Sequence, residues 1–149
     1  MKTIKLTILF SMLLTIVSCS NNAESVEVKY ITEDIIKANP HNLKLNESKK
    51  WAVNTEMMVH VNAIDSKIKA FKGTTLKDYT DLGKTIHFNL RKLTKSCTMT
   101  GESHDELHKW LLPFFDLNDY LKKSATVENG EGMLEKMKYE FAVFNTYFE

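Results

Sequence analysis

One Cys, one Met and two His lie within the twelve residues from Cys97 to His108. Cys97 and Met99 carry soft sulfur atoms, which select copper(I) or zinc over calcium and magnesium. His104 and His108 are four positions apart, so on a helix their imidazoles share one face. This combination of a thiol, a thioether and two imidazoles is a candidate site for a soft metal ion.

The elements that would position these side chains follow residue 54. Apolar residues recur there at spacings of three and four in four successive stretches, and each stretch predicts a helix with one buried face. The stripes run over Met57–Phe71, Tyr79–Cys97, Leu107–Leu121 and Leu134–Phe148. The connections are short, so sequential helices should be antiparallel neighbours. We therefore predict an all-α fold, an up-down-up-down four-helix bundle over residues 54–149.

This topology brings the end of the second helix and the start of the third to the same end of the bundle. Cys97 and His104 should meet there, with Met99 in the connecting turn and His108 one helical turn further on. Met58, on the flank of the first helix, is a further candidate ligand, whereas its neighbour Met57 belongs to the core stripe. The predicted metal ligands are Cys97, Met99, His104, His108 and Met58.

Local signals mark the ends of these helices. Asn54 is a plausible N-cap of the first helix. Ser103 and Glu106 match a capping box at the start of the third, in which each side chain satisfies a backbone N–H at the helix start. Pro113 lies inside the third helix and removes one of its backbone hydrogen bonds.

Residues 1–18 have the three-part layout of a secretory signal: two lysines, a short apolar run and then "VSC". The segment "IVSC" resembles the lipobox of bacterial lipoproteins. The resemblance implies cleavage before Cys19, attachment of lipid to that cysteine and anchoring to a membrane. Ser20 rather than Asp after the cysteine implies an outer-membrane lipoprotein that faces the periplasm, or alternatively the cell surface. A plain secretory signal would instead leave Cys19 free.

Residues 19–53 are polar and irregular for most of their length, and we expect a flexible, lipidated tether there. A small hairpin could form around "NESK" in residues 43–53. The chain has 149 residues, 43% of them hydrophobic, and a formal net charge of +1. Since it has no basic block and no acidic tail, we do not expect a nucleic-acid partner.

The run C-T-M-x-G-x-x-H-D-x-L-H-x-W-L-x-P, from Cys97 to Pro113, is similar to one in small, largely uncharacterised lipoproteins of Gram-negative bacteria. The resemblance implies a helical domain in the periplasm, without an established activity. In that pattern a His follows the proline, whereas this chain has Phe114. One ligand of such a site would therefore be missing here.

Several functions compete at this stage. The first is a lipoprotein that sequesters or passes on a metal ion, copper(I) in preference to zinc. The alternative is a non-catalytic interaction module that binds another envelope protein, with Cys97, His104 and His108 in structural roles, since buried Cys commonly acts as a small apolar residue. A haem bundle with Met58 and His108 as ligands is disfavoured, and no CxxCH attachment motif is present. An enzyme is not predicted, because no third group is identified to orient a Cys–His pair.

Overall fold

The structure is a computed structural model that describes residues 32–149, so the predicted signal peptide, Cys19 and residues 20–31 lie outside the described residues. Residues 32–149 are all-helical and contain no β-strand. A helical stretch over residues 32–38 comes first. It is followed by η1 (Pro40–Asn42), α2 (Thr55–Lys69), α3 (Leu76–Lys95), α4 (Glu102–Lys122) and α5 (Val127–Tyr147). No helix in this described part is both long and apolar enough to cross a membrane.

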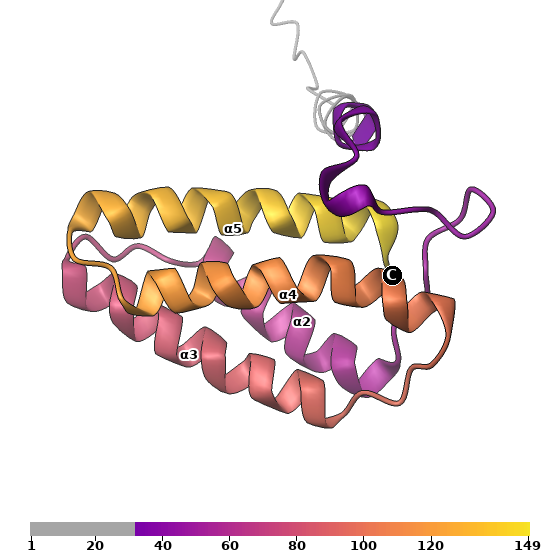
Figure 1. The fold of residues 1–149 in the computed structure, drawn as a ribbon. Helices are drawn as coiled ribbons and strands as arrows, with labels where there is room; N and C mark the ends of the chain where they lie inside the picture. Colours follow the sequence, from indigo (N-terminus) through magenta and orange to yellow (C-terminus); the bar gives the residue numbers. More distant parts are fainter. Residues whose placement is uncertain (1–31) are drawn as a thin grey trace, which may run out of the picture.

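The four long helices lie side by side (Figure 1). Each of α2, α3 and α4 contacts the helix that follows it, and α5 also contacts α2 and α3. The start of α2, the end of α3, the start of α4 and the end of α5 gather at one end of the molecule (Figure 1). The connection between α3 and α4, which contains Cys97 and Met99, therefore lies at this end of the molecule (Figure 1).

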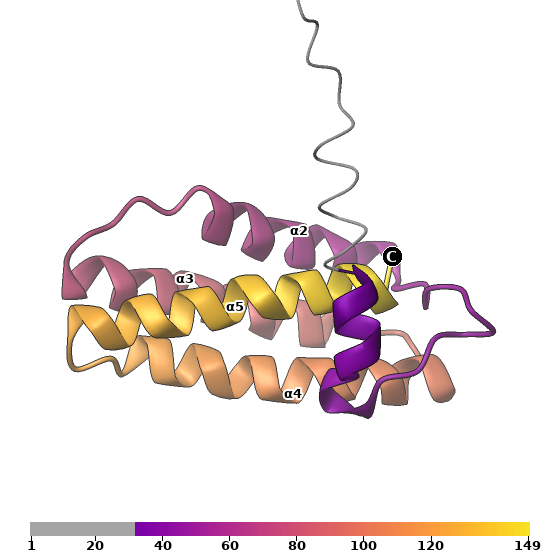
Figure 2. The ribbon, with the colours of Figure 1, turned by 90° about the horizontal axis from the view of Figure 1, so that it is seen from above.

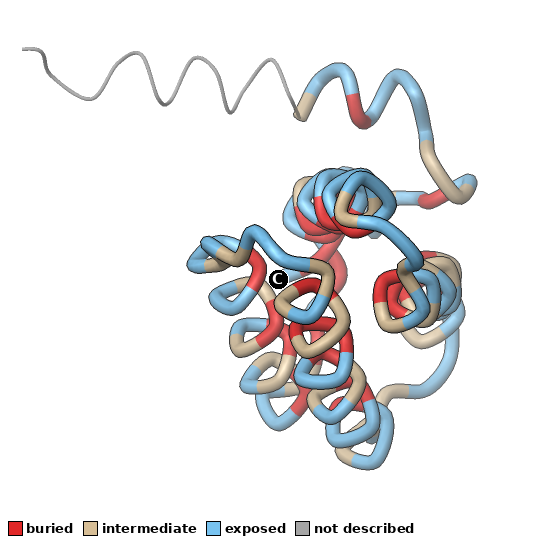
Figure 3. Tube along the Cα trace, turned by 90° about the vertical axis from the view of Figure 1, so that its left-hand side faces the viewer, coloured by how far each residue is buried: buried red, intermediate tan, exposed pale blue. Residues whose placement is uncertain are grey.

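Each helix buries the face that its apolar residues mark. In α3, Leu82, Ile86, Leu90 and Leu93 recur at spacings of three and four and are all buried. A view along the helices shows their buried residues turned toward a common centre and their exposed residues turned outward (Figure 3). Removal of this apolar surface from water is the main force that holds the helices together.

An aromatic cluster joins α4 to α5. The Trp110 ring stacks on Phe114 with ring centroids 5.1 Å apart and packs against Phe144 at 4.8 Å. A buried indole N–H needs a hydrogen-bond partner. Trp110 Nε1 has one, because it donates a hydrogen bond of 2.8 Å to the backbone carbonyl of Glu140. Trp110 is completely buried, so it lies in the core between the two helices.

The expectation that residues 19–53 form a flexible tether is wrong for the part that the structure describes, residues 32–53. The helical stretch 32–38 crosses over α5 (Figure 2) and buries Ile35. Residues 40–53, which we call the strap, bury three apolar side chains against the long helices: Leu43, Trp51 and Val53. These side chains are spaced too irregularly for a helix or strand pattern, but they are apolar enough to pack.

Backbone hydrogen bonds fasten the end of the strap to the C-terminus. Trp51 N–H donates to the Tyr147 carbonyl at 2.8 Å, and Glu149 N–H donates to the Trp51 carbonyl at 2.9 Å. Within the strap, Asn46 and Lys49 exchange two backbone hydrogen bonds of 2.9 and 2.8 Å around a two-residue turn, at the place where the sequence suggested a hairpin. The end of the strap and the last residues, 147–149, are thus tied together next to the start of α2.

The expected capping box at the start of α4 is wrong. The N-cap of α4 is Gly101, with φ 68° and ψ −153°, and no side chain caps the helix. Glu106 instead points to the strap, where its Oε2 accepts a hydrogen bond of 2.9 Å from Lys44 N–H. Its other oxygen pairs with Lys109 Nζ at 2.6 Å. A tertiary contact therefore takes the side chain that the local pattern assigned to the helix end.

Candidate metal centre

The predicted site coincides with a cavity of about 240 Å³ between α2, the end of α3 and the first half of α4. It is lined by Met57, Thr94, Cys97, His104, Leu107, His108 and Leu111. Three of the five predicted ligands are in this lining: Cys97, His104 and His108. The other lining side chains are mostly apolar, with Thr94 as the exception.

Cys97 is positioned by the turn that ends α3. The helix stops at Lys95, and Cys97 N–H makes a long hydrogen bond of 3.5 Å to the Thr94 carbonyl. The preceding residue, Ser96, accepts a hydrogen bond of 3.1 Å from the Asn54 side chain at the start of α2. Cys97 is half-buried and is a free thiol. This turn therefore holds the sulfur at the junction of α2 and α3.

The two histidines come from the first two turns of α4. Their ring centroids are 4.3 Å apart and the ring planes are tilted by 57°. His104 is half-buried, whereas His108 is exposed. Because Gly101 adopts a φ and ψ that are almost restricted to glycine, the turn before α4 depends on that residue. Gly101 thereby sets the direction in which α4, and with it the imidazole pair, leaves the turn.

The thioether that reaches the cavity is that of Met57. Its side chain is only 1% exposed, so it belongs to the core and to the cavity wall at once. Met58 and Met99, the two predicted thioether ligands, are half-buried and pack against the core, but neither lines the cavity. The structure thus brings together one thiol, two imidazoles and a thioether, with Met57 in place of the predicted methionines.

These side chains do not form a closed cage. Within residues 32–149, no three or more His, Cys, Asp and Glu side chains are grouped closely enough to hold a metal ion. The carboxylates next to the histidines also point elsewhere, since Asp105 is exposed and Glu106 binds the strap. The side chains with donor atoms that line the cavity are Cys97, His104 and His108, together with the buried Met57.

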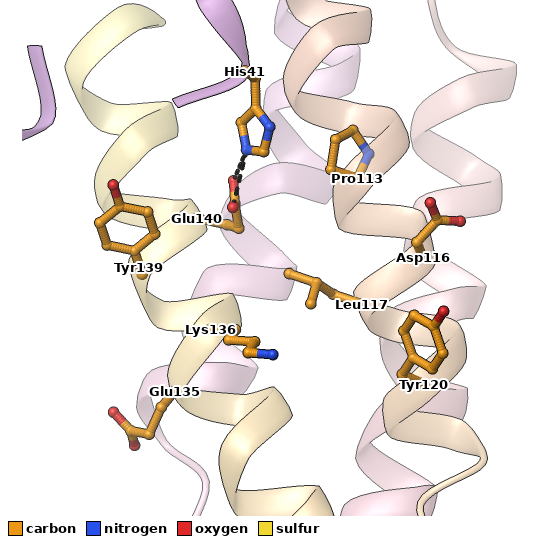
Figure 4. A pocket seen from close by; sticks show the side chains of 9 residues that line it. All are labelled: His41, Pro113, Asp116, Leu117, Tyr120, Glu135, Lys136, Tyr139 and Glu140. Carbon is orange, nitrogen blue, oxygen red and sulfur yellow. Dashed lines mark hydrogen bonds and ion pairs between the residues drawn. The ribbon is translucent and has the colours of Figure 1, made fainter. Parts of the chain in front are cut away.

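A second cavity, a groove of about 470 Å³, lies between α4 and α5 (Figure 4). At one end of it His41 Nε2 lies 2.9 Å from Glu140 Oε2. Burial raises the pKa of the Glu140 carboxyl, and the hydrogen bond with His41 opposes part of that rise. Tyr120 on α4 and Tyr139 on α5 lie on opposite sides of the groove and are 66% and 45% exposed.

This groove was not predicted from the sequence. Glu140 is a carboxylate directly before the buried Phe141, within the fourth apolar stripe. Charged residues flank many core positions of these helices, such as Lys67 before Ile68, so Glu140 carried no distinct signal, and its partner His41 lies 99 positions away in the strap.

Comparisons with known proteins gave no match: no family model matches the chain, and no curated protein or solved structure is similar enough to it to count as a match.

Proposed function

We propose that this protein is an outer-membrane lipoprotein, anchored through lipid on Cys19, that binds copper(I) for sequestration or transfer. In this proposal residues 1–18 are a signal peptide and the domain faces the periplasm. The four long helices form an up-down-up-down bundle, and the metal binds at the end where α3 gives way to α4. The protein carries out no catalysis.

One observation carries the proposal: a single cavity is lined by Cys97, His104, His108 and Met57. Cys97, His104 and His108 flank one short connection, and the fold adds Met57 from α2, 40 positions before Cys97. A thiolate and a thioether are soft ligands, and imidazole binds copper and zinc alike. The donor set therefore favours a soft transition metal over hard ions such as calcium and magnesium.

The number of donors favours copper(I) over zinc. Structural zinc sites are almost always tetrahedral with four Cys, His or carboxylate ligands. The cavity offers three such ligands, and its fourth donor is the thioether of Met57. A thioether suits copper(I) better than zinc, because copper(I) is the softer ion.

The experiment is an anaerobic titration of the chain from residue 20 onward with copper(I), in the presence of a chelator that competes for the ion. We expect binding of one ion per chain. Cys97→Ser and His104→Ala should each weaken binding by roughly 100-fold, because even the loss of a residue that only orients a ligand costs 10–100-fold. His60→Ala on α2 is the matched control, since His60 does not line the cavity.

Equal affinity in all four proteins would exclude the candidate metal centre. Binding that survives in His104→Ala but is lost in Cys97→Ser would indicate a site that uses the thiol without the imidazole pair.

A second candidate function, a non-catalytic module that binds another envelope protein, is favoured by the groove between α4 and α5. Its exposed tyrosines and the floor residues Pro113 and Leu117 form an apolar surface, and Asp116 and Glu135 border it (Figure 4). The matching occupant is a peptide segment with an apolar side chain next to a basic one. On this alternative Tyr120→Ala abolishes capture of such a partner, and Cys97→Ser changes stability alone.

A further inference from the structure

One face of α3 carries a row of basic side chains. Its members recur at spacings typical of a single helix face and line a shallow recess of about 360 Å³. The basic members are Lys84, His87, Arg91, Lys92 and Lys95; together with Phe88, which lies among them, we call them the basic face. Because helical spacing separates the charges along the chain, they form no consecutive block, and the sequence analysis found no basic patch.

Little negative charge accompanies this face along the chain. No Asp or Glu occurs between residues 82 and 101, although the whole chain is close to neutral. Lys84 pairs with Asp81 at 2.8 Å. By contrast, no carboxylate in the described part of the chain forms an ion pair with Arg91, Lys92 or Lys95.

The neighbouring helix adds one acid at the edge. Asp119 on α4 is close enough to His87 for the two charges to interact, but its carboxylate pairs with Lys122 at 2.6 Å. Lys122 Nζ in turn lies 3.4 Å from His87 Nδ1. Asp119 and Lys122 therefore neutralise each other, and this edge leaves the net charge of the basic face unchanged.

An exposed aromatic ring stands among the cations. Phe88 is 58% exposed, although it is a large apolar side chain. Lys92 Nζ lies over the ring, 4.5 Å from its centroid, in a cation–π contact. An apolar side chain within a ring of positive charge is the pattern of a surface that lies at the headgroup level of a membrane.

We propose that the basic face binds the surface of an anionic phospholipid bilayer. The cations contact headgroup phosphates, and the Phe88 ring enters the boundary between headgroups and acyl chains. The row extends along one helix, so several headgroups of a bilayer can contact its cations at the same time. Charge complementarity identifies the partner, because the excess positive charge is local to this face.

This contact is independent of the proposed lipid anchor and of the candidate metal centre. α3 lies on the opposite side of the molecule from residues 32–38, where the described chain begins (Figure 1). None of the six residues lines the candidate metal centre. A chain without lipid should therefore still bind anionic vesicles.

The test uses the unlipidated chain from residue 20 onward, which keeps all the described residues. Its binding is measured by co-sedimentation with vesicles of phosphatidylcholine alone or mixed with phosphatidylglycerol. We expect binding only to the mixed vesicles, and weaker binding as salt screens the charges. Arg91→Gln combined with Lys92→Gln should lower the partition constant about 25-fold, since each basic side chain near such a surface contributes roughly fivefold.

Phe88→Ala should lower the partition constant by about tenfold while leaving its salt dependence unchanged, because the ring contributes apolar burial and no charge. The control is Lys136→Gln combined with Lys138→Gln on α5, which removes the same charge elsewhere and should change binding by about twofold or less. All five substituted positions are exposed, and circular dichroism checks that each variant is folded.

Equal losses in the basic-face and control variants would overturn the proposal, because binding would then follow net charge alone. No binding to the mixed vesicles at low salt would also overturn it. Binding to a DNA duplex that is stronger than binding to the vesicles, and equally dependent on Arg91 and Lys92, would assign the face to nucleic acid instead.

Discussion

Glu106 gives the sharpest mutational test of how the strap is held against α4. Its side chain is only 4% exposed, and it makes two charge-assisted contacts: with Lys44 N–H at 2.9 Å and with Lys109 Nζ at 2.6 Å. Lys109 Nζ also donates to the Asn42 carbonyl at 3.2 Å. The Glu106 carboxylate therefore holds the strap against α4 in two ways. It contacts Lys44 directly, and it positions Lys109, which contacts Asn42.

Glu106→Ala should lower the free energy of unfolding by about 3 kcal/mol. A hydrogen bond to a charged group contributes about 1.5–3 kcal/mol, and a buried donor left without a partner costs a further 1–3 kcal/mol. The Lys109 side chain is 34% exposed, so solvent screens that ion pair and we count it for little. Glu106→Gln keeps an acceptor for Lys44 N–H and should lose only about half as much.

The assay is urea unfolding, paired with hydrogen exchange at the Lys44 amide. We expect that amide to be protected in the wild type and in Glu106→Gln and to exchange freely in Glu106→Ala. Glu102→Ala on the same helix, where the side chain is exposed, should change stability by about 0.5 kcal/mol or less. If Glu106→Ala matched Glu102→Ala in both readouts, the strap would not depend on Glu106.

Three further substitutions test other parts of the account. Asn118 is completely buried on α4, and neither polar atom of its side chain has a hydrogen-bond partner among the described residues. Asn118→Leu should therefore raise the free energy of unfolding, measured in urea, by about 1–2 kcal/mol. A lower free energy of unfolding would show that the amide has a partner. Gly101→Ala should lower stability by about 2 kcal/mol, because alanine is strained at the φ of 68°, and it should also weaken copper(I) binding; affinity equal to wild type would show that the turn does not set the site. Thr75→Ala removes a capping-box oxygen at the start of α3 and should cost about 1 kcal/mol. The hydrogen bond from Thr75 lowers the pKa of Asp78 below 3.8. The stability that Asp78 adds is therefore present above that value and is lost as pH falls through the folded-state pKa. If the difference in unfolding free energy between wild type and Asp78→Asn stayed constant from neutral to acidic pH, this assignment would be contradicted.

The helices could be predicted from the sequence because burial on a helix follows its period. Ile64 and Ile86, which lie at the centres of their apolar stripes, are completely buried. The same logic predicted that Cys97 and His104 would come together, since both flank one short connection. These features depend on local order along the chain, which a sequence displays directly.

The features that were missed depend on partners distant in sequence. The pattern of Ser103 and Glu106 matched a capping box, yet Lys44 lies 62 positions from Glu106 and takes its carboxylate. His41, likewise, lies 99 positions from Glu140, the carboxylate with which it pairs.

The choice between Met57 and Met58 was missed for a different reason. One residue turns a helix by about 100°, and periodicity assigned Met57 to the core without showing that the core wall is also the cavity wall. Only the arrangement of all the helices decides which thioether faces the cavity.

The most direct test of the central claim is X-ray absorption spectroscopy of the protein loaded with one equivalent of copper(I). We predict a first coordination shell that contains both sulfur, from Cys97, and nitrogen, from the His104 and His108 pair, with the nitrogen contribution reduced in His104→Ala. A shell of nitrogen and oxygen alone, or one that is identical in wild type and in Cys97→Ser, would contradict the assignment of copper(I) to the cavity at the start of α4.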